Sequence, residues 1–374
     1  MEIYLDHAAT GVMRPESVAA YCSAAACGNP SSLHSKGIEA KRLLESSRRS
    51  VASAFGCLPE EIFFTSGGSE GNNTAIFGLA RLRAKRAKRI ILSEGEHPSV
   101  ENPVKELVSQ GFEAKYIPTS GGRLDLDSLR EALSVPTALV CVMLANNETG
   151  ALYDIAGVRR AIDSSGSGAF FHCDAVQGFL KTPDSAKLKR YCDTASVSAH
   201  KVGGPKGVGA LFVKSGVKIP PLIYGGGQER GLRSGTEDLP GAAAFAAACE
   251  AHTARENEYI ASLREYTVKL LSDPQDGIVI RTPEKFVPSI LSISVPGVRS
   301  EVMLNALSAE GICVSAGSAC SAARKGSSRV LEAYGMPKEE SDSALRLSFG
   351  VTNTEEECAA AAQAIVSAAR RLRR

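Results

Sequence analysis

The chain has 374 residues, of which 44% are hydrophobic and 22% are charged, and its formal net charge is +2. This length suits two or three globular domains, and the charge gives no electrostatic reason to expect binding to nucleic acid or to a membrane. Its 10 cysteines are too few for a disulfide scaffold and lack the Cys-x-x-Cys spacing of a zinc site. We therefore expect reduced thiols, no metal and, because no signal-peptide pattern is present, a cytoplasmic location.

The first two thirds of the chain alternate between strand and helix patterns. Apolar runs predict strands at 62–64, 89–92, 114–117, 137–144, 169–173 and 195–198, with helices at 70–85, 98–110, 126–133 and 154–164. A further strand at 207–213 follows too closely for a helical crossover and should be antiparallel. The pattern indicates an α/β protein with a mostly parallel, seven-stranded sheet that is covered by helices on both faces.

The pattern changes after Pro240. An alanine-rich helix at 241–271 should link the first unit to a second, smaller α+β unit. Its predicted strands are 289–295, 312–315 and 344–349, and its predicted helices are 300–309 and 354–372. We assign residues 15–255 to a large domain, and residues 1–14 and 256–374 to a small domain.

Lys201 lies where the predicted strand 195–198 enters a glycine-rich turn. Because alternate residues of a strand share a face, Ser198 and His200 should point together and supply two hydrogen-bond donors beside this lysine. Taken alone, such a pattern is more often a turn at the surface. A buried strand upstream in the chain favours a functional role for this lysine instead.

The predicted strand 169–173 delivers Asp174 at its end, with Gln177 three positions later. A buried acid needs a partner for its charge. A pyridinium nitrogen is such a partner, and a lysine that acts with an aspartate facing the ring nitrogen is the usual protein contribution to pyridoxal phosphate chemistry. Lys201 and Asp174 therefore explain each other.

Three other predicted strands also end in polar residues. Gly68 and Ser69 open a helix whose free N–H groups suit a phosphate, although Ser69 and Glu70 could merely cap that helix. His97 follows the strand 89–92, and a lone histidine in a loop is more often structural. Asn147 ends the strand 137–144. In open α/β sheets ligands bind at the carboxyl ends of the strands, so these residues should line one cleft with Asp174 and Lys201.

Two candidate residues belong to the second unit. Cys320 stands among small residues and glycine, which is typical of an exposed loop and makes it a candidate nucleophile. Cys313, in the apolar run 312–314, should be buried and inert. Arg346 interrupts an apolar strand; a half-buried guanidinium requires a carboxylate, and a substrate could provide it.

These residues lie within motifs that resemble the pyridoxal-phosphate-dependent cysteine desulfurases of the NifS/IscS type. The resemblance runs from Tyr4 to about Leu372. Its most specific motifs are residues 4–10, 28–32, 65–67, 96–97, 146–148, 172–175, 198–201, 225–236 and 315–320. So many matches in the same order make a chance resemblance implausible.

The resemblance implies a pyridoxal-phosphate-dependent transferase of fold type I, and a homodimer with active sites at the subunit interface. It assigns the covalent attachment of the cofactor to Lys201, the pyridine nitrogen to Asp174, and ring stacking with an acid or base role to His97. The other implied cofactor contacts are Gly68, Ser69, Asn147, Gln177, Ser198, His200 and, toward the other subunit's phosphate, Thr236. Arg346 and Asn147 would bind the substrate, and Cys320 would take its sulfur.

The reaction implied by this family converts L-cysteine to L-alanine and leaves a persulfide on Cys320. A sulfur-acceptor protein of iron-sulfur cluster, thio-cofactor or tRNA biosynthesis would then receive the sulfur. Two alternatives stay open. The scaffold could serve a selenocysteine lyase, an aminotransferase or a β-lyase, or it could belong to an inactive member that acts as a binding partner.

Overall fold

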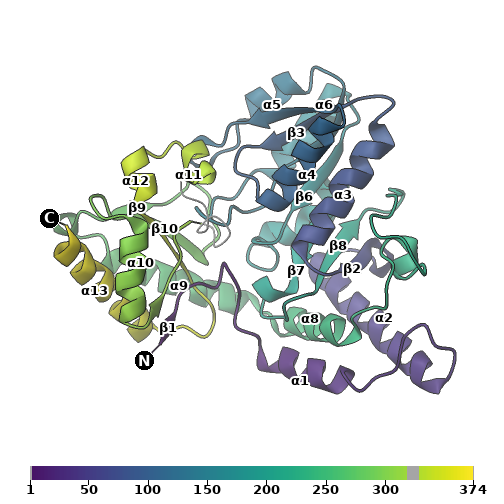
Figure 1. Ribbon diagram of the computed structural model, residues 1–374, viewed down its shortest axis with the longest axis horizontal. Helices are drawn as coiled ribbons and strands as arrows, with labels where there is room; N and C mark the ends of the chain where they lie inside the picture. The colour runs from purple at the N-terminus through teal and green to yellow at the C-terminus, as the bar shows by residue number, and fades with distance from the viewer. Residues whose placement is uncertain (1, 318–327, 374) are drawn as a thin grey trace.

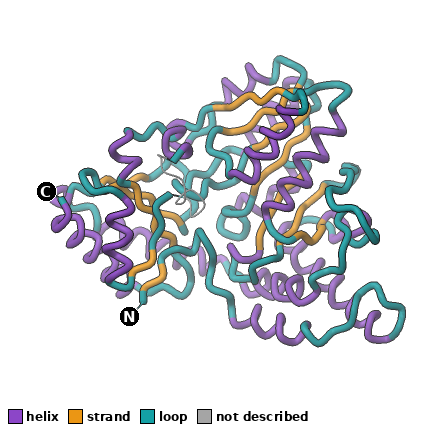
Figure 2. Tube along the Cα trace, in the orientation of Figure 1, coloured by secondary structure: helices purple, strands orange, loops and turns teal. Residues whose placement is uncertain are grey.

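A computed structural model describes residues 2–317 and 328–373 of the chain. Its largest element is a sheet of seven strands (Figures 1 and 2). Their order across the sheet is β2 (Ile62–Thr65), β8 (Gly209–Val213), β7 (Thr194–Ser198), β6 (Phe170–Asp174), β5 (Thr137–Cys141), β3 (Arg89–Ser93) and β4 (Glu113–Ile117). Only β8 runs antiparallel to its neighbours in this sheet. The predicted α/β class, strand number and antiparallel strand are confirmed.

Helices cover both faces of the sheet. They are α1 (Pro15–Ala24), α2 (Ser35–Phe55), α3 (Gly68–Arg83), α4 (Pro98–Ser109), α5 (Leu126–Ala132), α6 (Ile155–Ser165), α7 (Leu188–Tyr191) and α8 (Leu239–Ala251). The side chains of β3 alternate between these two faces. Ile90 and Leu92 pack in the core beneath α3 and α4, and Ile91 packs in the core beneath α2, α6 and α8. This alternation buries both faces of the strand, as a parallel sheet requires.

The predicted single helix at 241–271 is wrong. Two helices, α8 and α9 (Ala254–Leu270), meet at a break formed by His252 and Thr253, both of which have extended backbone. Thr253 begins α9 with a capping box, in which its N–H donates to a carboxylate oxygen of Glu256 at 3.2 Å. The capping residue thus starts a new helix where the alanine-rich segment ends.

The second unit packs its helices against a sheet of three antiparallel strands, and both ends of the chain lie in this part of the molecule (Figure 1). The strands are β12 (Ala344–Ser348), β10 (Ile290–Ser294) and β9 (Val279–Arg281), and a parallel pair joins β1 (Ile3–Tyr4) to β11 (Ile312–Cys313). The helices are α9, α10 (Ser300–Ala309), α11 (Arg329–Ala333), α12 (Lys338–Asp342) and α13 (Glu355–Leu372). The mixed character predicted for this unit is confirmed.

Separate apolar cores lie within the two units. The core of the second unit contains Ile3 and Leu5 together with side chains from Ile260 to Ala369. The division at residues 15 and 255 stays a prediction. None of the helices in the described part of the chain is both long and apolar enough to cross a bilayer.

Candidate active site

A cavity of about 250 Å³ opens at the carboxyl ends of the parallel strands. It is lined by the predicted residues Gly68, Ser69, His97, Asn147, Asp174, Gln177, Ser198, His200, Lys201 and Arg346. Arg346 comes from the second unit, so the cavity lies between the two units. The predicted convergence of strand ends is therefore a feature of the structure.

Lys201 lies just beyond the carboxyl end of β7. This strand ends at Ser198, and a single 3-10 turn, Ala199–Lys201, carries the lysine beyond the sheet edge. The Lys201 ammonium donates to the carbonyl oxygens of Ala8 at 2.5 Å and of Ala9 at 2.7 Å. The N-terminal segment therefore orients this side chain from outside the large sheet.

Asp174 is the last residue of β6 and is 6% exposed. One carboxylate oxygen accepts a hydrogen bond of 2.7 Å from the Asn72 amide, and the other accepts one of 3.0 Å from the backbone N–H of Val176. These donors on both oxygens fix the orientation of the carboxylate. Asp174 can therefore present a negative charge to a cationic ring nitrogen in the cavity.

His97 caps helix α4. Its Nδ1 accepts from the backbone N–H of Ser99 at 3.1 Å and lies 2.8 Å from the Ser99 hydroxyl. Burial lowers the pKa of His97 from its usual value; the positive charge of Lys201 acts in the same direction, and Asp174 opposes it. Burial therefore favours the neutral form of this imidazole.

The N-terminus of α3 forms one wall of the cavity. Its cap residue is Gly67, with a φ of 149° that side chains rarely allow, and no side chain caps the helix. A Cβ on Gly68 would stand 2.5 Å from a methyl group of Val176. Gly68 and Ser69 of this N-terminus line the cavity, and Ser69 does not cap the helix, whereas a carboxylate oxygen of Glu70 accepts from the backbone N–H of Ser66 at 2.7 Å.

Arg346 is 2% exposed, so the half-buried position predicted for it is wrong. Its guanidinium donates to a carboxylate oxygen of Asp6 and to the carbonyl oxygen of Asn147, each at 2.8 Å. The carboxylate that this arginine requires thus belongs to the chain itself. The Arg346 Nε, which is also buried, has no hydrogen-bond acceptor within residues 2–317 and 328–373.

Gln177 and His200 complete the wall around Lys201. The Gln177 amide donates to the Ala8 carbonyl at 2.8 Å and accepts from the ammonium of Lys181 at 3.3 Å. Burial, together with Lys201, lowers the pKa of His200 to about 4. Both residues are therefore neutral hydrogen-bonding groups beside the lysine.

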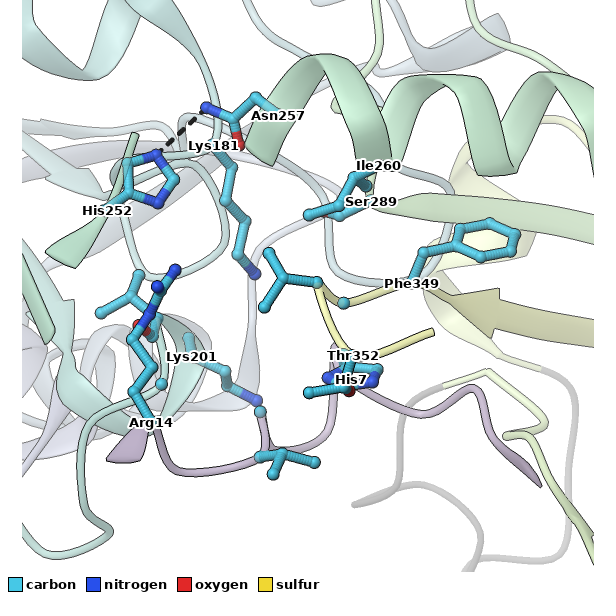
Figure 3. A pocket seen from close by; sticks show the side chains of 16 residues that line it. His7, Arg14, Lys181, Lys201, His252, Asn257, Ile260, Ser289, Phe349 and Thr352 are labelled. Carbon is cyan, nitrogen blue, oxygen red and sulfur yellow. Dashed lines mark hydrogen bonds between the residues drawn. The ribbon is translucent and has the colours of Figure 1, made fainter. Parts of the chain in front are cut away.

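A second, smaller cavity of about 70 Å³ adjoins Lys201 (Figure 3). Lys181 and His7 point into it from different segments of the chain (Figure 3). Burial, followed by the charges of Lys201 and Arg346, lowers the pKa of Lys181 to about 7. Polar groups thus surround Lys201 on two sides.

Thr236 does not line the cavity and is exposed in this single chain. Its loop is held by a buried ion pair between Arg48 and Glu229 and by a contact from Arg233 to Glu70 at 3.1 Å. The contact predicted between Thr236 and another subunit stays a prediction.

Of the two candidate cysteines, the structure describes Cys313. Cys320 lies outside the described residues, so its predicted role stays a prediction. Cys313 is partly exposed at the end of β11, which corrects the prediction that it is buried. In the described part of the chain, β11 pairs with a single strand, β1. Burial nevertheless raises the pKa of the Cys313 thiol above its usual value.

Several polar residues at the site were not predicted. Asp6 pairs with Arg346, Asn72 and Ser99 connect Asp174 with His97, and Lys181 contacts Gln177. Asp6 lies in the family motif at residues 4–10, from which a role at the site could have been predicted. Asn72 and Ser99 lie inside helices, where the sequence offers nothing to distinguish them from surface residues.

Comparison with known proteins identifies the family. The model of the aminotransferase class-V family matches residues 3–360. The cysteine desulfurase IscS of Dictyoglomus turgidum is 37% identical over 95% of this chain and 91% of its own length.

Two solved structures are also similar. A NifS-like protein has a TM-score of 0.91 at 37% identity and covers 98% of this chain and 99% of its own. SspA in complex with cysteine has a TM-score of 0.79 at 28% identity and covers 94% of this chain and 100% of its own. The chain therefore belongs to the aminotransferase class-V family, in the group of NifS/IscS-type cysteine desulfurases.

Proposed function

We propose that this protein is a cysteine desulfurase that converts L-cysteine to L-alanine and keeps the sulfur as a persulfide on Cys320. The observation that carries the proposal is one cavity in which the Lys201 ammonium, the Asp174 carboxylate and the Arg346 guanidinium meet. The similar proteins that bear this name, and the one solved with cysteine, support the choice of substrate.

The residues of the cavity fit pyridoxal phosphate, on which this class of enzyme depends. Gly68 and Ser69 at the N-terminus of α3 would bind the phosphate through their N–H groups, and Ser198 lines the same cavity. Asp174 would hold the ring nitrogen, and Lys201 would hold the cofactor covalently. When bound, the cofactor supplies a sink for the electrons of the substrate Cα–H bond.

The side chains around this group have separate tasks. Lys201 would take the Cα proton of the substrate at Nζ. Asp174 would hold the proton of the ring nitrogen. Arg346, whose Nε–H has no acceptor among residues 2–317 and 328–373, and Asn147 would bind the substrate carboxylate. His97, which lines the same cavity, would act as an acid or base. Because its pKa is lowered by burial, it enters the reaction as neutral imidazole.

The sulfur transfer involves the Cys320 thiol. Its thiolate attacks the substrate sulfur, a sulfur–sulfur bond forms, and the bond between Cβ and sulfur breaks. Carbon receives the electron pair and a proton, so that L-cysteine and the enzyme thiol become L-alanine and an enzyme persulfide. The persulfide then passes its outer sulfur to an acceptor protein.

Further parts of the proposal concern assembly. We propose a homodimer in which Thr236 reaches the phosphate bound by the other subunit. Its exposure supports this, as does a loop that the Arg48–Glu229 pair anchors at 2.7 Å. We also propose the domain division at residues 15 and 255 and a cytoplasmic location.

The test combines product analysis with peptide mapping. The purified protein should release alanine from L-cysteine in equal amount to sulfide when a reducing thiol is present. Borohydride reduction should fix pyridoxal phosphate to Lys201, and Lys201→Ala should remove both results. Lys206→Ala, at an exposed lysine in the same segment, should change neither.

Three results would decide against the proposal. Cofactor fixed to another lysine would refute the assignment of the site. Activity confined to selenocysteine, or transamination without sulfide release, would favour the alternative enzymes. A protein that binds the cofactor without any turnover would favour an inactive binding partner.

A further inference from the structure

A buried chain of hydrogen bonds connects Asp174 with His97. The Asn72 amide nitrogen donates to Asp174 at 2.7 Å and to the Ser99 hydroxyl at 2.8 Å. The Ser99 hydroxyl in turn lies 2.8 Å from Nδ1 of His97. Asn72 is 0% exposed, so water cannot replace its partners. Asn72 and Ser99 thus connect the two groups that would act on the cofactor ring.

The orientation of the Asn72 amide follows from its neighbours. The Asp174 carboxylate accepts hydrogen bonds only, so the nitrogen of Asn72 must face it. The amide oxygen then faces Nε2 of His172 at 2.9 Å, and His172 must donate from this nitrogen. His172 is fully buried, and burial lowers its pKa to about 3, so it is a neutral ring with one proton. Its Nδ1 therefore accepts from the Thr194 hydroxyl at 2.9 Å.

The hydrogen bonds of Ser99 determine the tautomer of His97 in the same way. Because the Ser99 oxygen accepts from Asn72, the hydroxyl proton is directed to Nδ1 of His97. The Ser99 backbone N–H donates to this nitrogen as well, at 3.1 Å. A nitrogen that receives two hydrogen bonds cannot carry a proton. The proton of the neutral imidazole is therefore on Nε2, the nitrogen left to the cavity.

We propose that Asn72 and Ser99 are positioning residues that hold His97 as the Nε2–H tautomer, so that it offers a proton to the substrate rather than accepting one. This inference rests on the proposed function for the role of His97. Asn72 fixes the direction of the Ser99 hydroxyl, and the Asp174 carboxylate fixes Asn72. The charges that face His97 are those of Asp174 and Lys201. A loss of the Ser99 hydroxyl removes a donor that favours the unprotonated Nδ1.

The test is nitrogen NMR of the cofactor-loaded protein with labelled histidine. The chain has only 6 histidines, and His97→Gln identifies the resonances of interest. We expect Nδ1 unprotonated and Nε2 protonated at neutral pH. Ser99→Ala should move the titration midpoint of this ring to higher pH, and Ser99→Thr should restore it. Ser109→Ala, in an exposed serine of the same helix, should leave the ring unchanged.

Kinetics provide a second measurement. Ser99→Ala should lower kcat by about fivefold to tenfold with KM for L-cysteine unchanged, since one hydrogen bond is lost away from the substrate. A proton on Nδ1 in the wild-type protein would overturn the inference, as would a Ser99→Ala protein with an unaltered titration. If Ser99→Ala does not fold, the tautomer of the wild type and of Ser99→Thr decides. The NMR result does not depend on turnover, so an Nε2–H ring in a protein that releases no sulfide would contradict only the proposed function.

Discussion

Arg346 and Asp6 are 340 positions apart in the chain, yet their guanidinium and carboxylate meet at 2.8 Å beside the cavity. Arg346 is also bound to the Asn147 carbonyl, so two of its donors are occupied before a substrate arrives. These two contacts hold the guanidinium in one orientation. Its buried Nε–H has no acceptor in the described part of the chain. Asp6 thus orients the arginine that we assign to the substrate carboxylate.

Arg346→Lys tests this orientation. A lysine keeps the charge but cannot bind Asp6, Asn147 and a carboxylate together, because it lacks the planar guanidinium. We expect KM for L-cysteine to rise at least about tenfold, which corresponds to the loss of one charged hydrogen bond. Arg130→Lys, at an exposed arginine, is the control. An unchanged KM would show that Arg346 is only structural.

Asp174→Asn should impair catalysis far more than folding. Its single amide oxygen can accept from Asn72 or from Val176 but not from both, and the side chain carries no charge to keep the ring nitrogen protonated. We expect kcat to fall at least about 100-fold, the effect of losing one strong charged interaction. Thermal unfolding of the variant should stay near that of the wild type. Full turnover in this variant would reduce Asp174 to a structural residue at the end of a strand.

Cys320→Ser should separate proton removal from sulfur transfer. Removal of the Cα proton requires Lys201 but no thiol, so exchange of this proton with deuterated water should persist while sulfide release is lost. Cys313→Ser is a demanding control, because the structure leaves Cys313 partly exposed. Its raised pKa keeps it as a thiol at neutral pH, and we expect full activity. Sulfide release that depends on Cys313 instead would mean that the wrong thiol had been chosen.

Glu96 should make the protein less stable as the pH rises. It is 1% exposed, and burial raises its pKa to about 8 from 4.5. Between these values the folded state binds the proton and the unfolded state does not, so the free energy of unfolding falls as the pH rises. Glu96→Gln should remove this dependence and gain up to a few kcal/mol at pH 8, as measured by denaturant unfolding. Glu106→Gln, an exposed change on α4, should leave the slope as it is.

Arg48→Met should weaken both the fold and cofactor binding. The Arg48 and Glu229 side chains are 3% and 2% exposed, and loss of one partner leaves a buried charge that costs about 3–5 kcal/mol. Glu229 has a φ of 47°, so the loop before Thr236 depends on this pair to keep its conformation. Equilibrium dialysis should therefore show weaker binding of pyridoxal phosphate. The double variant Arg48→Met, Glu229→Gln should recover part of the stability but not the affinity.

The sequence by itself determined the sheet and the place of the site. Strands and helices are encoded by local periodicity, and the carboxyl ends of parallel strands must share one edge, so Asp174 and Lys201 could be brought together without coordinates. The identity of these side chains then indicated the cofactor. The same local rules misjudged the helix at 241–271, because the capping box at Thr253 interrupts a segment whose composition is continuous.

Only the tertiary structure decided which polar residues support the site. Asn72 is an ordinary helix residue in the sequence, yet it contacts Asp174 and His172 of β6 and Ser99 of α4. The partner of Arg346 and the exposure of Cys313 are likewise set by distant segments. Hydrogen bonds and burial depend on distances in space, and sequence periodicity determines only the face of an element on which a residue lies.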